Sequence, residues 1–110
     1  MRVEVLYFRG CPNHVLAVSR VRQALQSVQP PAEIHEIEVS SQAEAEDIRF
    51  LGSPSVRING LDIEPESRSV KTYGLGCRTY VEGQVRSGVP PIDLIRRALV
   101  EQTAGLGSVK

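Results

Sequence analysis

The stretch that most constrains the fold lies near the N-terminus, where an apolar segment at residues 3–8 leads through a Gly-Cys-Pro turn at residues 10–12 into a helical pattern. Apart from Glu4, residues 3–8 are β-branched, aliphatic or aromatic, as expected of a central strand covered on both faces. Apolar side chains then recur at helical spacing over residues 15–28, and the prolines at 30–31 end that helix. The chain therefore begins with a strand, a cysteine-bearing turn and a helix.

The middle of the chain alternates predicted strands and helices. Residues 32–39 carry isoleucine and valine in a β-rich run, and we expect this second strand to lie parallel to the first. A serine N-cap followed by acidic side chains predicts a helix over residues 42–50. Residues 53–58 predict a third strand with a proline at its start, and Asn59-Gly60 predicts a tight turn into an antiparallel return at residues 61–63.

The last third of the chain carries weaker local signals. Residues 64–76 contain proline, serine and glycine with few apolar side chains, which predicts a long connecting loop. A short edge strand is expected over residues 77–81, and the prolines at 90–91 open a final amphipathic helix. We therefore expect one domain over residues 1–103, followed by a flexible tail at residues 104–110.

Composition excludes several classes of function. Thirteen Lys and Arg residues balance thirteen Asp and Glu residues, so the charge gives no support for a nucleic-acid partner. No apolar run approaches the roughly 18–20 residues of a membrane span, so we expect no membrane partner. Residues 1–8 lack the apolar centre of a signal peptide, which favours a cytoplasmic location. In a reducing compartment, two cysteines are more often reactive, metal-binding or buried than joined in a structural disulfide.

Cys11 is the strongest candidate for a functional side chain. It follows a strand and precedes a helix, where unsatisfied N–H groups and the positive end of the helix dipole favour thiolate over thiol. The alternative is an inert, buried cysteine that behaves as a small apolar side chain.

Two further residues are candidates for the same site. His14 lies three residues after Cys11, a spacing that places both on one face of a helix, where the imidazole stabilises a thiolate or acts as a base. Cys77 follows a glycine-rich stretch, and we expect it either to fold over Cys11 as a resolving thiol or to be a buried strand residue. The acidic run at residues 62–66 is interpreted as a solvated loop.

The pattern predicts neither a cofactor nor a dedicated metal site. The glycines at 74 and 76 lack the spacing of a dinucleotide-binding loop. Two thiols and His14 suit a soft metal ion, but a structural zinc site needs four ligands at tighter paired spacings.

Three segments together resemble a known group of proteins. They are Tyr-Phe-Arg-Gly-Cys-Pro-Asn-His at residues 7–14, Leu-Gly-Ser-Pro-Ser-Val at 51–56 and Tyr-Gly-Leu-Gly-Cys-Arg at 73–78. They resemble small bacterial thioredoxin-like proteins, some of which are labelled as related to alkylmercury lyase. The order β-α-β-α-β-β-α over residues 2–101 likewise resembles the thioredoxin fold, which is an α/β fold with a central mixed sheet flanked by helices.

This resemblance implies a site. It implies a cis peptide bond before Pro54, which would lie beside Cys11, and a backbone at Ser53 that hydrogen-bonds an extended thiol substrate. Pro12, Ser53 and Pro54 are then the substrate-binding residues. His14 stands where the family's Cys-x-x-Cys motif has its second cysteine, so the attacking position alone carries over.

The leading hypothesis is a redox protein that exchanges thiols and disulfides. Cys11 would attack a small thiol's disulfide or a protein disulfide, with His14 assisting and Cys77 resolving. The alternatives are a non-enzymatic protein that binds a soft metal or an organomercurial, and an interaction module without redox chemistry.

Overall fold

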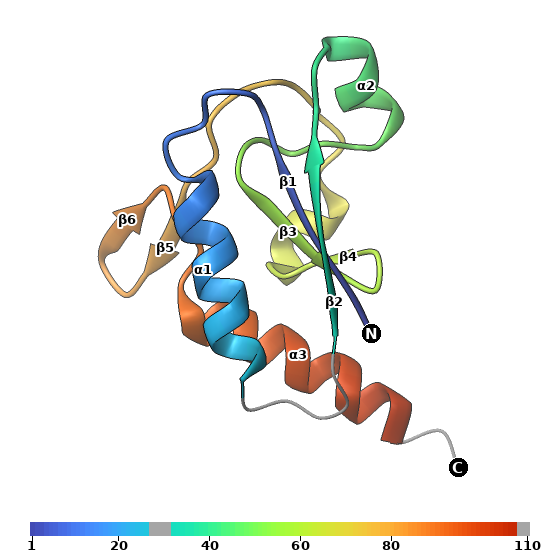
Figure 1. Cartoon of the computed structure of the whole chain (residues 1–110), viewed down its shortest axis with the longest axis vertical. Helices are drawn as coiled ribbons and strands as arrows, with labels where there is room; N and C mark the ends of the chain where they lie inside the picture. The colour runs from blue at the N-terminus through green and yellow to red at the C-terminus, as the bar shows by residue number, and fades with distance from the viewer. Residues whose placement is uncertain (27–31, 108–110) are drawn as a thin grey trace.

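The predicted opening strand forms as β1 (Arg2–Tyr7) and lies inside a four-stranded sheet of order β2-β1-β3-β4 (Figure 1). The computed structural model describes residues 1–26 and 32–107. Its other elements, in chain order, are α1 (His14–Leu25), β2 (Glu33–Glu38), α2 (Gln42–Asp47), β3 (Ser55–Ile58), β4 (Leu61–Asp62), the 3-10 helix η1 (Pro65–Ser69), β5 (Tyr80–Glu82), β6 (Val85–Ser87) and α3 (Ile92–Gly107).

The sheet is mixed. β1 pairs with β2 in parallel, with Arg2 opposite Glu33, and with β3 in antiparallel fashion, with Val5 opposite Val56. β3 and β4 are antiparallel. The predicted parallel pair, the antiparallel return and the α/β class are thereby confirmed.

Both faces of β1 are covered, as its apolar sequence predicts. Val3 and Val5 pack with α1 and α3 in the larger core cluster, whereas Leu6 points to the opposite face. There it joins Ala45 of α2 and Phe50 in a smaller cluster. The carboxyl end of β1 is therefore held between two packed layers, and the turn at residues 10–12 follows from this fixed end.

Two local signals are confirmed in detail. Ser41 caps α2, because its Oγ accepts a hydrogen bond from the Glu44 N–H at 3.1 Å. Asn59 and Gly60 both have positive φ, 53° and 85°, as the turn between β3 and β4 requires.

Several predicted boundaries differ from the structure. α1 begins at His14, so Cys11 lies before the helix, as predicted, but too far before it to share a helix face with His14. α2 ends at Asp47 instead of residue 50, because Arg49 takes a left-handed φ of 60°. The Arg57 guanidinium donates to the Ile48 and Arg49 carbonyls, each at 2.7 Å. These hydrogen bonds satisfy backbone carbonyls that lie just after the end of α2.

The C-terminal third departs further from the prediction. In place of an edge strand over residues 77–81, β5 pairs with β6 in a separate two-stranded sheet. α3 continues to Gly107, past the predicted boundary at residue 103. The predicted stop of α1 at residues 30–31 and the end of the tail at residues 108–110 lie outside the described residues. Within the described ranges, no helix is long and apolar enough to cross a bilayer.

Candidate functional site

Ser53 is the residue to which the Cys11 turn is attached. The Cys11 N–H donates to the Phe8 carbonyl at 3.2 Å, which closes the turn after β1. The Phe8 N–H in turn donates to Ser53 Oγ at 3.3 Å. Ser53 is buried, and its peptide bond to Pro54 is cis, as the resemblance implied.

The same serine also holds the second cysteine segment. The Ser53 N–H donates to the Gly76 carbonyl and the Arg78 N–H donates to the Ser53 carbonyl, both at 2.9 Å. These bonds make an isolated parallel bridge between Ser53 and Cys77. We call residues 76–78 the strap. Ser53 thus joins the segments of both cysteines, one through its side chain and the other through its backbone.

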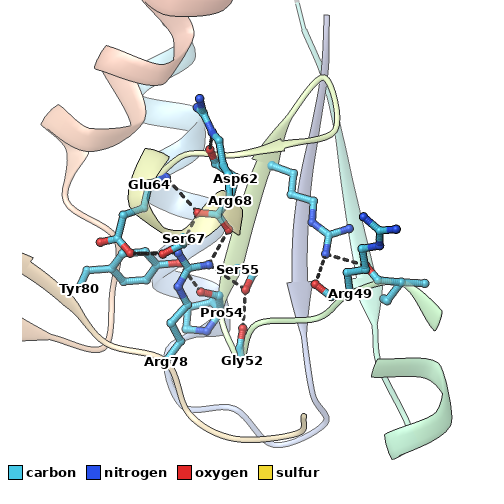
Figure 2. A network of polar contacts seen from close by, with 12 residues as sticks. Arg49, Gly52, Pro54, Ser55, Asp62, Glu64, Ser67, Arg68, Arg78 and Tyr80 are labelled. Atoms are coloured by element: carbon cyan, nitrogen blue, oxygen red, sulfur yellow. Dashed lines mark hydrogen bonds and ion pairs between the residues drawn. The ribbon is translucent and has the colours of Figure 1, made fainter. Parts of the chain in front are cut away.

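The strap is anchored by an ion pair that is almost fully buried (Figure 2). Arg78 and Asp62 are 8% and 6% exposed, and the guanidinium donates two parallel hydrogen bonds to the Asp62 carboxylate, at 2.6 and 2.7 Å. Arg78 also donates to Ser55 Oγ at 3.1 Å and to Glu64 at 3.4 Å. These partners satisfy a charge that would otherwise be costly to bury.

Tyr80, the first residue of β5, makes further contacts that hold the strap in place. Its hydroxyl donates to the Pro54 carbonyl at 2.6 Å, and its ring lies 4.6 Å from the Arg78 guanidinium carbon (Figure 2). Gly52 allows the close approach. It has a φ of +117°, and a Cβ there would lie 3.1 Å from both the Arg78 Cβ and the Gly76 carbonyl oxygen. The strap therefore lies tightly against the segment before β3.

Burial and charge act in opposite directions on the titration of this cluster. Burial, the largest single influence, lowers the pKa of Arg78, but the hydrogen bonds to Asp62 together with the charge interactions of Tyr80, Asp62 and Glu64 raise the pKa above the ordinary arginine value. Burial raises the pKa of the Tyr80 phenol, and the positive charge of Arg78 acts against it without cancelling it. Arg78 therefore stays charged and Tyr80 stays neutral across physiological pH.

The structure uses His14 differently from the prediction. Because Cys11 precedes α1, the expected shared helix face does not exist. The His14 ring stacks on Tyr7, with centroids 3.6 Å apart and planes 7° apart. Its Nε2 lies 2.7 Å from the Glu36 carboxylate on β2. His14 is thus held between β1 and β2 by two specific contacts.

The other predicted site residues fall into different environments. Cys11 is partly buried and Cys77 exposed, and both are free thiols. Pro12 is exposed, whereas Pro54 is buried and its carbonyl accepts the Tyr80 hydroxyl. Among the residues that the structure describes, no group of three or more His, Cys, Asp or Glu side chains is arranged to hold a metal ion.

Sequence reasoning missed the Arg78–Asp62 pair. The interpretation of residues 62–66 as a solvated acidic loop is wrong for Asp62, which is buried. The missed signal is the position of Asp62 between Leu61 and Ile63 after a hairpin turn, since a short strand that starts there puts one of its side chains inward. A buried carboxylate needs a cationic partner, and the sequence does not indicate which arginine supplies it.

A cleft of about 430 Å³ opens beside the Cys11 turn. Its lining combines apolar side chains with opposite charges and a hydroxyl, from Phe8, Arg9, Glu38, Val39, Ser40 and Leu75. The Phe8 carbonyl accepts the Cys11 N–H, and Leu75 directly precedes the strap, so the cleft borders both cysteine segments.

No protein-family model, curated protein or solved structure matches this chain.

Proposed function

We propose that this chain is a thioredoxin-like thiol–disulfide exchange protein in which Cys11 is the nucleophile and Cys77 the resolving thiol. One observation supports this more than any other: Ser53 is hydrogen-bonded both to the turn that carries Cys11 and to the strap that carries Cys77. A buried residue with both attachments ties the backbones of the two cysteine segments to one point, and both thiols are free.

The chemistry needs no group beyond the two thiols and a disulfide substrate. The Cys11 thiolate attacks one sulfur of the substrate disulfide, the substrate's S–S bond breaks, and its other half leaves as a thiolate. The Cys77 thiolate then attacks the Cys11 sulfur and releases the second half. The protein is oxidised to a Cys11–Cys77 disulfide, while the substrate takes up the two electrons as two thiols. Two molecules of a small thiol restore the reduced protein.

His14 is assigned a positioning role in this scheme. Its stacking on Tyr7 and its contact with Glu36 fix the first residue of α1, three residues after Cys11. His14→Phe preserves an aromatic ring for the stack and removes the titrating nitrogen. We expect it to retain the Cys11 reaction rate that His14→Ala loses, whereas equal losses in both variants would identify the imidazole as a base.

The test is a count of released thiol after reduced protein meets glutathione disulfide. The wild-type chain should release two thiols per molecule and acquire an intramolecular disulfide, while Cys77→Ser should release one and retain a mixed disulfide on Cys11. Cys11→Ser is the matched control and should react no faster than free cysteine. Wild-type protein that behaves like Cys11→Ser would contradict the proposal.

A further inference from the structure

The backbone of Ser53 is already used by the chain itself. An extended peptide that adds to a backbone edge needs a free N–H and a free C=O there. The single N–H of Ser53 donates to the Gly76 carbonyl at 2.9 Å, and the Ser53 carbonyl accepts from the Arg78 N–H at 2.9 Å. The strap therefore occupies the position that a bound peptide strand would take.

The strap is not held by these two bonds alone. Moving the strap away from Ser53 would break both Arg78–Asp62 hydrogen bonds, which are 2.6 and 2.7 Å long. The Asp62 carboxylate would then either be exposed to solvent or stay buried without a partner. Just upstream, the Gly74 N–H donates to the Phe50 carbonyl at 3.1 Å, and the Tyr73 carbonyl accepts from Gln42 Nε2 at 2.9 Å. Contacts on both sides of Cys77 thus keep the edge closed.

The cleft next to the Cys11 turn, on the side of Phe8 and Arg9, has the size of a small-molecule site. The cleft next to Phe8 and Leu75 has a volume of about 430 Å³, within the roughly 300–1,000 Å³ typical of sites for small ligands. Arg9 and Glu38 place one charge of each sign on its wall. Such a lining suits a compact charged ligand, with Glu38 available to an amine and Arg9 available to a carboxylate.

We infer that the substrate of Cys11 is the disulfide of a low-molecular-weight thiol, and that extended polypeptide disulfides are excluded by the strap. This inference rests on the proposed thiol exchange. The bond changes are those given above, with each half of the small disulfide leaving as a thiol while Cys11 and Cys77 are oxidised.

Two reagents with one leaving group test the substrate class. The first is the 2-thiopyridyl mixed disulfide of cysteamine, and the second is the same disulfide on a cysteine inside an extended peptide of about ten residues. Both release pyridine-2-thione, which is followed by absorbance. The protein is Cys77→Ser, so that Cys11 is its one thiol, and each rate is divided by the rate of free cysteine with the same reagent.

The cysteamine reagent should react at least about tenfold faster than the peptide reagent after this normalisation, because the peptide cannot use the Ser53 backbone. Equal normalised rates, both above that of free cysteine, would overturn the substrate class and leave thiol exchange standing. If neither reagent reacts faster than free cysteine, thiol exchange fails, and the substrate class fails with it.

Amide hydrogen exchange on the unmodified wild-type chain gives an independent measurement. The Ser53 and Arg78 amides should be protected to the same degree as the amides of β1 and β3, because they donate the two hydrogen bonds that join Ser53 to the strap. Exchange of these two amides as fast as that of exposed loop amides would show that the edge opens readily, and would overturn the exclusion of peptides. This result does not depend on whether Cys11 is reactive.

Discussion

The two cysteine segments are held in place by different means. The Cys11 turn is formed mainly by its neighbours in sequence, since it is closed by the Phe8 carbonyl and followed closely by α1, and the bond from the Phe8 N–H to Ser53 Oγ is its one long-range attachment described above. The strap that carries Cys77 depends on partners far along the chain, above all on Asp62, sixteen residues away. A short-range turn tolerates changes elsewhere in the molecule, whereas the strap is only as stable as its buried ion pair.

Removing the strap's charge should have the largest effect on stability. Arg78→Met leaves the Asp62 carboxylate buried without a partner, and we expect a loss of about 3–5 kcal/mol in the free energy of unfolding. The matched control is Arg2→Met on β1, whose ion pair with Glu4 is more exposed and should contribute less than about 1 kcal/mol. Urea denaturation of both variants measures the difference, and equal losses would show that the strap is not specially anchored.

A double substitution separates the destabilisation caused by an unpaired buried charge from the destabilisation caused by lost packing. Arg78→Met combined with Asp62→Leu replaces the pair by apolar side chains, which is often neutral or stabilising in a buried site. We expect the double variant to recover most of the stability lost in Arg78→Met. A double variant as unstable as the single one would mean that the strap needs the ion pair for its geometry.

Substituting one glycine near each cysteine segment tests how closely that segment is packed. Gly10, in the Cys11 turn, has a φ of +83° and open space where a Cβ would lie, whereas Gly52 is crowded by the strap. Gly10→Ala should therefore cost about 1–2 kcal/mol from its backbone conformation alone. Gly52→Ala should cost about 2–4 kcal/mol, because a Cβ also makes tight contacts of 3.1 Å with the Arg78 Cβ and the Gly76 carbonyl oxygen, which must shift to admit it. Equal values in thermal or urea unfolding would argue against a tightly seated strap.

Tyr80 makes the strap sensitive to alkaline pH. Burial raises its pKa in the folded chain, whereas the unfolded phenol ionises near about pH 10. The stability that the neutral Tyr80 phenol contributes is fully present below about pH 10. It is lost as the pH rises toward the pKa of Tyr80 in the folded chain, and the free energy of unfolding falls by at most about 1.4 kcal/mol per pH unit. Urea unfolding between pH 9 and pH 11 should show this decline, and Tyr80→Phe should make it shallower. An unchanged slope in that variant would assign the decline to other groups.

The contrast also explains how much the sequence predicts. β1, the Ser41 cap and the Asn59-Gly60 turn depend on residues close together in the chain, and their patterns predict them. The strap depends on which arginine meets Asp62 across the fold, and no spacing rule supplies that pairing. The β5–β6 hairpin escapes prediction for a related reason, because its strands are three residues each and mostly exposed, so they show little apolar alternation.

The smallest expected effect concerns the cleft beside the Cys11 turn, where Arg9 is exposed and one residue separates it from Cys11. An exposed charge changes local ligand binding modestly, so Arg9→Ala should slow the reaction of Cys11 with an anionic aromatic disulfide by about two- to fivefold relative to cystamine. Arg22→Ala, which removes an exposed charge from the last turn of α1, is the control and should leave the ratio of the rates with the anionic disulfide and with cystamine unchanged. The effect should also shrink as salt is raised, because exposed charges are screened. Equal ratios in Arg9→Ala and Arg22→Ala would mean that the substrate reaches Cys11 without using the cleft, and would leave the strap alone to define the class of substrate.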